Sequence, residues 1–128
     1  MRILVVGDVV GRPGRRAVRD LLPALRAELA VDLTIANGEN AAGGRGLTVE
    51  TAEELLHAGV DVLTSGNHIW DQREIIPYLA QNVPVLRPHN YPVGVPGRGY
   101  LIHDLGPKGS VAVVNLSGRV NLLELDCP

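Results

Sequence analysis

Short apolar runs alternate with segments of helical periodicity, and this alternation is the strongest constraint on the fold. The apolar runs lie at residues 2–7, 31–36, 60–65 and 83–88. Helical segments are predicted between them at residues 14–30, 49–59 and 71–82. Strands that alternate with helices form βαβ units and a mainly parallel sheet, and near-continuous apolar strands are typical of sheets covered on both faces. The sequence therefore predicts an α/β fold.

The segment 14–30 has the clearest amphipathic pattern. Its apolar face carries Val18, Leu21, Leu22, Leu25 and Leu29. Pro23 lies inside the segment and predicts a kink or a break, because proline lacks the N–H that a helix needs. The next helical segment is predicted to begin after Thr48, which would be its N-cap, and to be ended by Gly59.

The last part of the chain has a different pattern. Residues 100–106 and 110–118 are predicted to be two strands joined by the turn "PKG", which indicates a hairpin. No crossover helix follows, and the chain ends in "RVNLLELDCP". In the favoured interpretation, residues 1–128 are the N-terminal half of a larger α/β domain. In the other, they are a small complete domain whose tail packs loosely.

The composition excludes several functional classes. Of the 128 residues, 45% are hydrophobic and 20% are charged, which predicts a folded chain with a core. The formal net charge of −2 gives no broad attraction for nucleic acid or anionic membranes. The apolar N-terminal run is too short for a signal peptide or a membrane span. The single cysteine, Cys127, permits no internal disulfide, so we expect a cytoplasmic protein.

Polar side chains follow each predicted strand at its carboxyl end, where parallel α/β sheets bind their ligands. In chain order they are Asp8, then Asn37, Glu39 and Asn40, then Asn67 and His68, and finally Arg87, His89 and Asn90. Glycines flank the first three groups and allow the backbone to turn sharply beside a ligand. Because these strand ends meet at one edge of the sheet, we expect Asp8, Glu39 and Asn67 to form one cluster that faces a metal ion.

Crowded carboxylates repel one another unless a positive charge lies between them, and a divalent metal ion supplies that charge. Carboxylate and amide oxygens with one imidazole suit Mn, Fe, Zn or Mg, whereas a single cysteine cannot build a thiolate site. Glu39 lies on the central loop and is the natural bridge between two metal ions about 3.5–4 Å apart. Taken singly, each residue also has a structural interpretation as a helix cap, a loop cap or a solvated side chain.

Other polar residues and motifs are assigned less weight. His57 and His103 are expected to be structural or exposed, Trp70 to be a packing anchor, and Asp71 to cap the helix that follows it. The stretch "GDVVGRPG" lies between a strand and a helix, like a dinucleotide-binding turn. Its spacing is not G-x-G-x-x-G, and Asp8 would direct negative charge at a pyrophosphate. The sequence has no P-loop motif either.

Taken together, the motifs resemble a known family. "GNH" after a strand is a signature of the calcineurin-like metallophosphoesterases. The full set of "GDVVGRPGR", "NGENAAGGRG", "TSGNHIWDQRE", "RPHNYP" and "VVNLSGRV", in this order, resembles the YmdB-like branch over essentially the whole chain. Members of that branch include 2′,3′-cyclic-nucleotide phosphodiesterases. The resemblance implies a layered α/β sandwich that hydrolyses phosphodiester bonds with two divalent metal ions, such as Fe or Mn.

The family pattern implies a role for each residue of the predicted cluster. Asp8 resembles a ligand of one metal ion, Glu39 the carboxylate that bridges both ions, and Asn40 and Asn67 ligands of the second. His68 resembles the catalytic histidine, which protonates the leaving ribose oxygen or hydrogen-bonds the phosphate. The implied reaction is in-line attack on phosphorus by a water that the metal ions activate.

Some features differ from the wider superfamily. The first strand ends in Asp-Val-Val where the superfamily has Asp-x-His, and Glu39 takes a position that is usually an aspartate. Arg87 and Asn90, at the end of the fourth predicted strand, are expected to contact a small nucleotide or phosphodiester substrate. No strong nucleic-acid surface is expected.

The family completes its metal site with histidines from the second half of its fold, and the present sequence stops before them. These 128 residues thus carry about half of the implied metal ligands. We expect weak metal binding, slow turnover and an exposed apolar sheet surface that favours a homo-oligomer or a complementing C-terminal half. The alternative is an inactive or regulatory fragment that retains the fold without catalysis.

Overall fold

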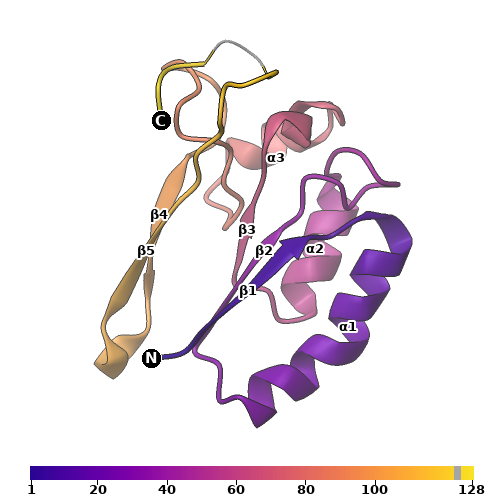
Figure 1. The fold of residues 1–128 in the computed structure, drawn as a ribbon, viewed down its shortest axis with the longest axis vertical. Helices are drawn as coiled ribbons and strands as arrows, with labels where there is room; N and C mark the ends of the chain where they lie inside the picture. The colour runs from indigo at the N-terminus through magenta and orange to yellow at the C-terminus, as the bar shows by residue number, and fades with distance from the viewer. Residues whose placement is uncertain (123–124) are drawn as a thin grey trace.

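Three parallel strands form the central sheet, in the order β1-β2-β3 (Figure 1). They span Ile3–Asp8, Leu33–Asn37 and Val62–Thr64. The structure is a computed structural model and describes residues 1–122 and 125–128. Each strand pairs with the one before it in the chain, so β1 forms one edge of this sheet. The prediction of a mainly parallel α/β fold is confirmed.

The fourth apolar run lies beside β3 but does not form a strand. Residues 83–88 make two isolated parallel bridges, which join Val85 to Leu63 and Leu86 to Arg98. The N–H of Leu63 donates to the carbonyl of Pro84 at 2.8 Å, and the N–H of Leu86 donates to the carbonyl of Leu63 at 2.8 Å. Two prolines in this run lack the N–H groups that a longer ladder needs. The predicted position was therefore right, and the predicted strand was wrong.

Three α-helices and two 3₁₀ helices connect the strands. The α-helices are α1 (Gly11–Glu28), α2 (Val49–His57) and α3 (Ile75–Leu79), and the 3₁₀ helices are η1 (Asn67–Trp70) and η2 (Gly106–Lys108). Thr48 caps α2 as predicted, because its hydroxyl accepts a hydrogen bond from the N–H of Thr51 at 3.2 Å. The Thr51 hydroxyl accepts in turn from the N–H of Thr48, which completes a capping box.

Two helix predictions were wrong in detail. Helix α1 begins at Gly11 instead of residue 14, and it continues past Pro23, so of the predicted kink or break the break is excluded. Pro23 and Arg19 lie on the exposed side of α1, so the Arg19 carbonyl that loses its helical partner lies on the side that faces water. Asp71 does not cap a following helix, because α3 begins only at Ile75.

An antiparallel hairpin forms the third layer, on the side of the sheet opposite α1 and α2 (Figure 1). Its strands are β4 (Tyr100–Asp104) and β5 (Ser110–Val114), and the predicted hairpin is confirmed. One apolar core lies between the sheet and the helices. A second, smaller core lies between the sheet and the hairpin, and contains Leu33, Val62, Leu86, Leu101 and Val113. The sheet is therefore covered by helices on one face and, over β2 and β3, by the hairpin on the other.

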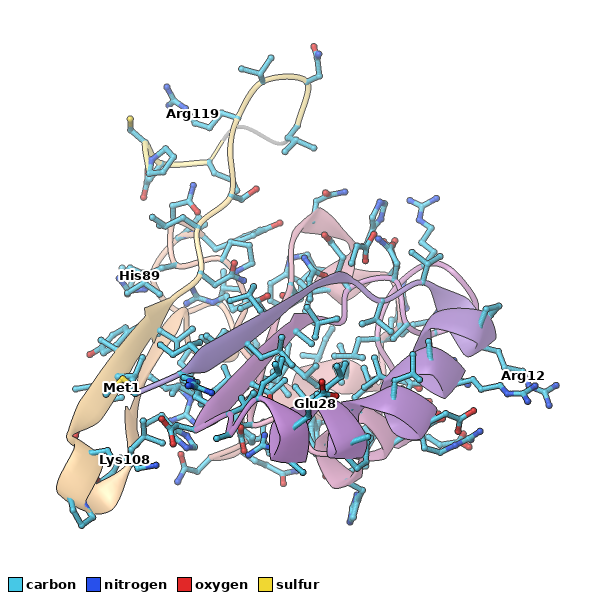
Figure 2. The ribbon with its side chains drawn as sticks, turned by 60° about the horizontal axis from the view of Figure 1, so that its bottom comes forward. Met1, Arg12, Glu28, His89, Lys108 and Arg119 are labelled. Carbon is cyan, nitrogen blue, oxygen red and sulfur yellow. The ribbon has the colours of Figure 1, made fainter. Side chains whose placement is uncertain are left out.

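Asp32 ties the hairpin to the start of the central sheet. Lys108, at the hairpin tip in Figure 2, donates to Asp32, and the N–H of Arg2 donates to the same carboxylate at 2.7 Å. These two hydrogen bonds lower the pKa of Asp32, with Lys108 the larger cause.

Within residues 1–122 and 125–128, no helix combines the length and apolar character needed to cross a bilayer.

Part of the predicted apolar face of α1 is uncovered. Val18 and Leu22 are buried in the core, whereas Leu21 is 59% exposed. On the neighbouring edge strand β1, Val5 is 69% exposed. An apolar groove of about 190 Å³ runs between the two elements, lined by Leu4, Val6, Ala17, Leu21 and Leu25 among others. The β1–α1 edge is thus an apolar surface open to solvent.

Candidate functional site at the carboxyl edge of the sheet

Asp8 ends β1 at the carboxyl edge of the parallel sheet. The pairing of β1 with β2 shifts between Val6 and Asp8, so that Asp8 pairs with Asn37 and Gly7 is the additional residue. A bulge of this kind turns the strand locally and redirects the side chain that follows it. The Asp8 side chain is exposed at this edge, beside the loop that follows β2.

The end of β2 and the loop after it bring three polar side chains to the same edge. The Asn37 amide oxygen accepts from the N–H of Glu39 at 3.0 Å, and its amide nitrogen donates to Glu39 Oε1 at 3.3 Å. Asn40 Nδ2 donates to Asp8 Oδ2 at 2.8 Å. This bond uses the nitrogen of Asn40, so the carbonyl oxygen of its side chain is the atom that can serve as a metal ligand.

Glu39 connects this loop to the loop after β3. Its Oε2 lies 2.5 Å from the position that a Cβ would occupy on Gly66, and Oε1 lies 2.8 Å from it. The backbone N–H of His68 donates to Glu39 Oε2 at 3.2 Å. Only glycine at position 66 leaves room for the carboxylate. Glu39 therefore spans the loops after β2 and β3, and its role as a bridging ligand stays a prediction.

His68 lies in η1, and its ring is held by an acidic neighbour. Its Nδ1 lies 2.7 Å from Asp71 Oδ2, and about a third of its side chain is exposed (30%). Arg45 Nε donates to the same Asp71 oxygen at 2.6 Å. The hydrogen bond from Arg45, and then that from His68, lower the pKa of Asp71.

The donor set fits a hard divalent cation. Asp8, Glu39, Asn40 and Asn67 offer carboxylate and amide oxygens, which Mn, Fe and Mg accept. In the part of the chain that the structure describes, no three His, Cys, Asp or Glu side chains are grouped closely enough to hold a metal ion. Two of the four predicted ligands are amides, so the site depends on one carboxylate pair and on oxygens from asparagine. The ligand roles of these four residues stay predictions.

The structure gives Arg87 and Asn90 different surroundings from those predicted. The Arg87 side chain is buried and donates to the carbonyl of Pro88 at 2.8 Å. Asn90 Nδ2 donates to the carbonyl of Ser117 at 2.9 Å, and its oxygen accepts the N–H of Ser117 at 3.0 Å. Both side chains therefore form hydrogen bonds with the backbone of neighbouring loop segments. This geometry favours a structural role, and substrate contact by either residue stays a prediction.

Sequence reasoning missed two residues at this edge. Asn115 is buried and donates to the carbonyl of Ser65 at 2.7 Å, which joins the end of the hairpin to the loop after β3. Arg45, in the glycine-rich loop after β2, holds Asp71. The three-residue spacing of His68 and Asp71 is a signal that could have identified their pairing, since residues three apart face each other on a helical turn.

His57 and Trp70 agree with the parts assigned to them. His57 lies on α2, and its side chain is 81% exposed. Trp70 packs against the core and meets the Tyr91 ring edge-on, with 5.4 Å between the ring centroids. His89 packs its ring against Tyr100 at 5.5 Å. Trp70 and His89 are thus each packed against a tyrosine ring.

The chain is similar to known proteins over nearly all of its length. The family described as YmdB-like protein matches residues 4–128. A 2′,3′-cyclic-nucleotide 2′-phosphodiesterase of Bacillus subtilis is 44% identical over 128 residues, which is 100% of this chain and 48% of the relative. The chain therefore spans about half the length of that curated relative.

Two solved structures resemble this one. A hypothetical protein of Thermus thermophilus superposes with a TM-score of 0.93 at 44% identity, over 100% of this chain and 49% of that one. A phosphatase of Mycoplasma pneumoniae superposes with a TM-score of 0.82 at 31% identity, over 91% of this chain and 42% of that one. The family match over residues 4–128 and these relatives show that the chain belongs to the YmdB-like family.

Proposed function

We propose that this chain is the N-terminal half of a metal-dependent phosphodiesterase that acts on 2′,3′-cyclic nucleotides. The observation that carries the proposal is the position of Glu39, which contacts Gly66 and the N–H of His68 while the neighbouring Asn40 holds Asp8. The name of the Bacillus subtilis relative supports the reaction class. The single cysteine, Cys127, agrees with the reducing cytoplasm as the place of action.

Four residues would hold two divalent ions, such as Fe or Mn. Asp8 would bind one ion, Asn40 and Asn67 the other, and Glu39 would bridge both from the central loop. When bound, the ions supply a water of lowered pKa and neutralise the charge of the phosphoryl oxygens. The exposed Asp8 carboxylate and its Asn40 partner leave this edge open to a small substrate.

His68 would act on the leaving oxygen of the substrate. Its Nδ1 is engaged by Asp71, so Nε2 is the nitrogen that can meet a ligand. A histidine held in this way can protonate the ribose oxygen as the P–O bond breaks. General acid catalysis of this kind raises the rate by about 10²–10⁴-fold. His68 is therefore the candidate proton donor.

The decisive experiment measures metal content and hydrolysis of 2′,3′-cyclic AMP by the chain with Mn²⁺. His68→Ala is expected to lower kcat by about a hundredfold or more, because it removes the proton donor. His57→Ala is the matched control, since His57 is exposed on α2. Equal rates for wild type and His68→Ala would remove His68 from the mechanism. Metal binding without any hydrolysis would favour the alternative of an inactive or regulatory fragment.

We also propose that a complementing C-terminal half covers the β1–α1 edge. The match to the Bacillus subtilis relative covers 48% of that protein and leaves the rest of it unmatched. The edge strand β1 offers backbone hydrogen bonds, and apolar side chains are exposed on both sides of it: Ile3 and Val5 on the face away from α1, and Leu21 and Leu25 on α1 itself. A polypeptide that adds a strand to β1 would satisfy both.

This surface is tested by mixing the chain with the C-terminal half of the Bacillus subtilis relative and measuring mass by light scattering. A one-to-one complex is expected, and the double substitution Val5→Glu and Leu21→Glu is expected to weaken it at least about tenfold. Val93→Glu is the control, because Val93 is fully exposed in a loop. If the chain alone forms a homodimer and the double variant is monomeric, the surface binds a second copy of the chain instead.

A further inference from the structure

We propose that Asp71 is a positioning residue that fixes the imidazole of His68, and that Arg45 holds Asp71 in place. The inference rests on the proposed role of His68 as proton donor. It goes further because it assigns a function to two residues outside the predicted ligand set. It also replaces the expectation that Asp71 caps a helix.

One oxygen atom joins the three side chains. Asp71 Oδ2 lies 2.7 Å from His68 Nδ1 and accepts from Arg45 Nε at 2.6 Å. The Asp71 side chain is 27% exposed and that of His68 is 30% exposed, whereas that of Arg45 is 71% exposed. The histidine and its acidic partner are thus the more sheltered pair, and the arginine covers them from the solvent side.

The loop that carries Arg45 is fixed against the end of η1. Gly46 has a φ of +83°, and a Cβ on it would lie 2.6 Å from Gln72 Cγ and 3.4 Å from Asp71 Cβ. Gln72 Nε2 donates to the Arg45 carbonyl at 3.2 Å. The close approach of the two backbones depends on glycine at position 46. Arg45 therefore reaches Asp71 from a loop whose position is set.

The chemical consequence concerns the two nitrogens of the ring. The Asp71 carboxylate accepts a hydrogen bond from Nδ1–H, so Nδ1 keeps its hydrogen in both the imidazolium and the neutral ring. The imidazolium then carries the transferable proton on Nε2, and the ring left after the transfer is the Nδ1–H tautomer. Hydrogen bonds from Arg45 and His68 keep the pKa of Asp71 low, so the partner stays ionised at neutral pH. The ring can then neither flip nor exchange its tautomer without losing this bond.

The test combines nitrogen NMR of the His68 ring with steady-state kinetics on Asp71→Ala and Asp71→Asn. Long-range ¹H–¹⁵N spectra above neutral pH are expected to show the Nδ1–H tautomer in the wild type and a mixture in Asp71→Ala. The kcat of Asp71→Ala is expected to fall at least about tenfold, with KM within about twofold, because orientation acts on the chemical step.

Asp71→Asn separates hydrogen bonding from charge. Both bonds use one oxygen of Asp71, so an asparagine carbonyl oxygen in that place can still accept from both partners. We expect this variant to restore the Nδ1–H tautomer and part of kcat. Asp20→Ala is the matched control, because Asp20 also pairs with arginines but lies on the exposed face of α1. It is expected to leave both readouts unchanged.

The outcomes distinguish this inference from the proposed function. An Asp71→Ala variant that keeps the wild-type tautomer would overturn the inference, whatever the rate. If the wild type binds Mn²⁺ but hydrolyses nothing, the proposed function fails, and the ring spectra still decide whether Asp71 positions His68. A loss of melting temperature with an unchanged tautomer would assign Asp71 a purely structural role.

Discussion

Gly66→Ala is expected to lower the affinity of the chain for Mn²⁺ about ten- to hundredfold, although Gly66 is not itself a predicted ligand. A loss of this size is typical when a residue that positions a metal ligand is changed. The added Cβ would lie 2.5 Å and 2.8 Å from the two Glu39 oxygens, far inside contact distance. The carboxylate must move away from the place between the two loops, and its hydrogen bond with the His68 N–H is lost with it.

Gly7→Ala is the matched control for this experiment. Gly7 lies at the same edge, carries the same substitution and has no atom within 4 Å of its added Cβ. Isothermal titration with Mn²⁺ should give wild-type affinity for Gly7→Ala, and circular dichroism should show both variants folded. Equal affinities of Gly66→Ala and wild type would mean that Glu39 is not a metal ligand.

Gly99→Ala is expected to lower the free energy of unfolding by about 2–3 kcal/mol, the upper part of the range for overpacked cores. Its Cβ would lie 2.2 Å from the Cα of His89, which is backbone and cannot rotate away. Both segments are held in place, because the Gly99 carbonyl accepts the N–H of Asn115 at 2.9 Å and the N–H of His89 donates to the Asn115 carbonyl at 2.7 Å.

Urea unfolding followed by circular dichroism measures this loss, and Gly118→Ala serves as its control. Gly118 has no atom within 4 Å of an added Cβ, and its φ is not in the left-handed region. A surface substitution of this kind changes the free energy of unfolding by less than about 0.5 kcal/mol. Equal urea midpoints for the two variants would show that the backbone around residues 89, 99 and 115 shifts to accept the added Cβ at little cost in stability.

The sequence was sufficient to predict the elements whose signals are local. The apolar runs of β1, β2 and β3, the cap at Thr48 and the turn between β4 and β5 all lie in short windows and were located correctly. The end of each parallel strand falls at one edge of the sheet by topology alone. That is why the sequence predicts Asp8 and Glu39 at the same edge.

The errors arose where a distant segment decides the outcome. Asp71 was expected to cap a helix, but Arg45, 26 residues earlier, provides a stronger partner for its carboxylate. The hydrogen bonds from Arg87 to the carbonyls of Pro88 and His89 were not foreseen either, and its contact with a substrate stays a prediction. Such contacts depend on how loops fold over one another, and no periodicity in the sequence reports them.

The strand order β1-β2-β3 has a consequence for biosynthesis. Each of these strands pairs with the strand that left the ribosome just before it, so no pairing in the parallel sheet has to wait for a later segment. Chains emerge N-terminus first, and contacts between neighbours in sequence form fastest. The edge that carries Asp8, Glu39 and His68 can therefore assemble on the nascent chain. The hairpin comes later in the chain, and Lys108 near its tip bonds Asp32, which lies just before β2.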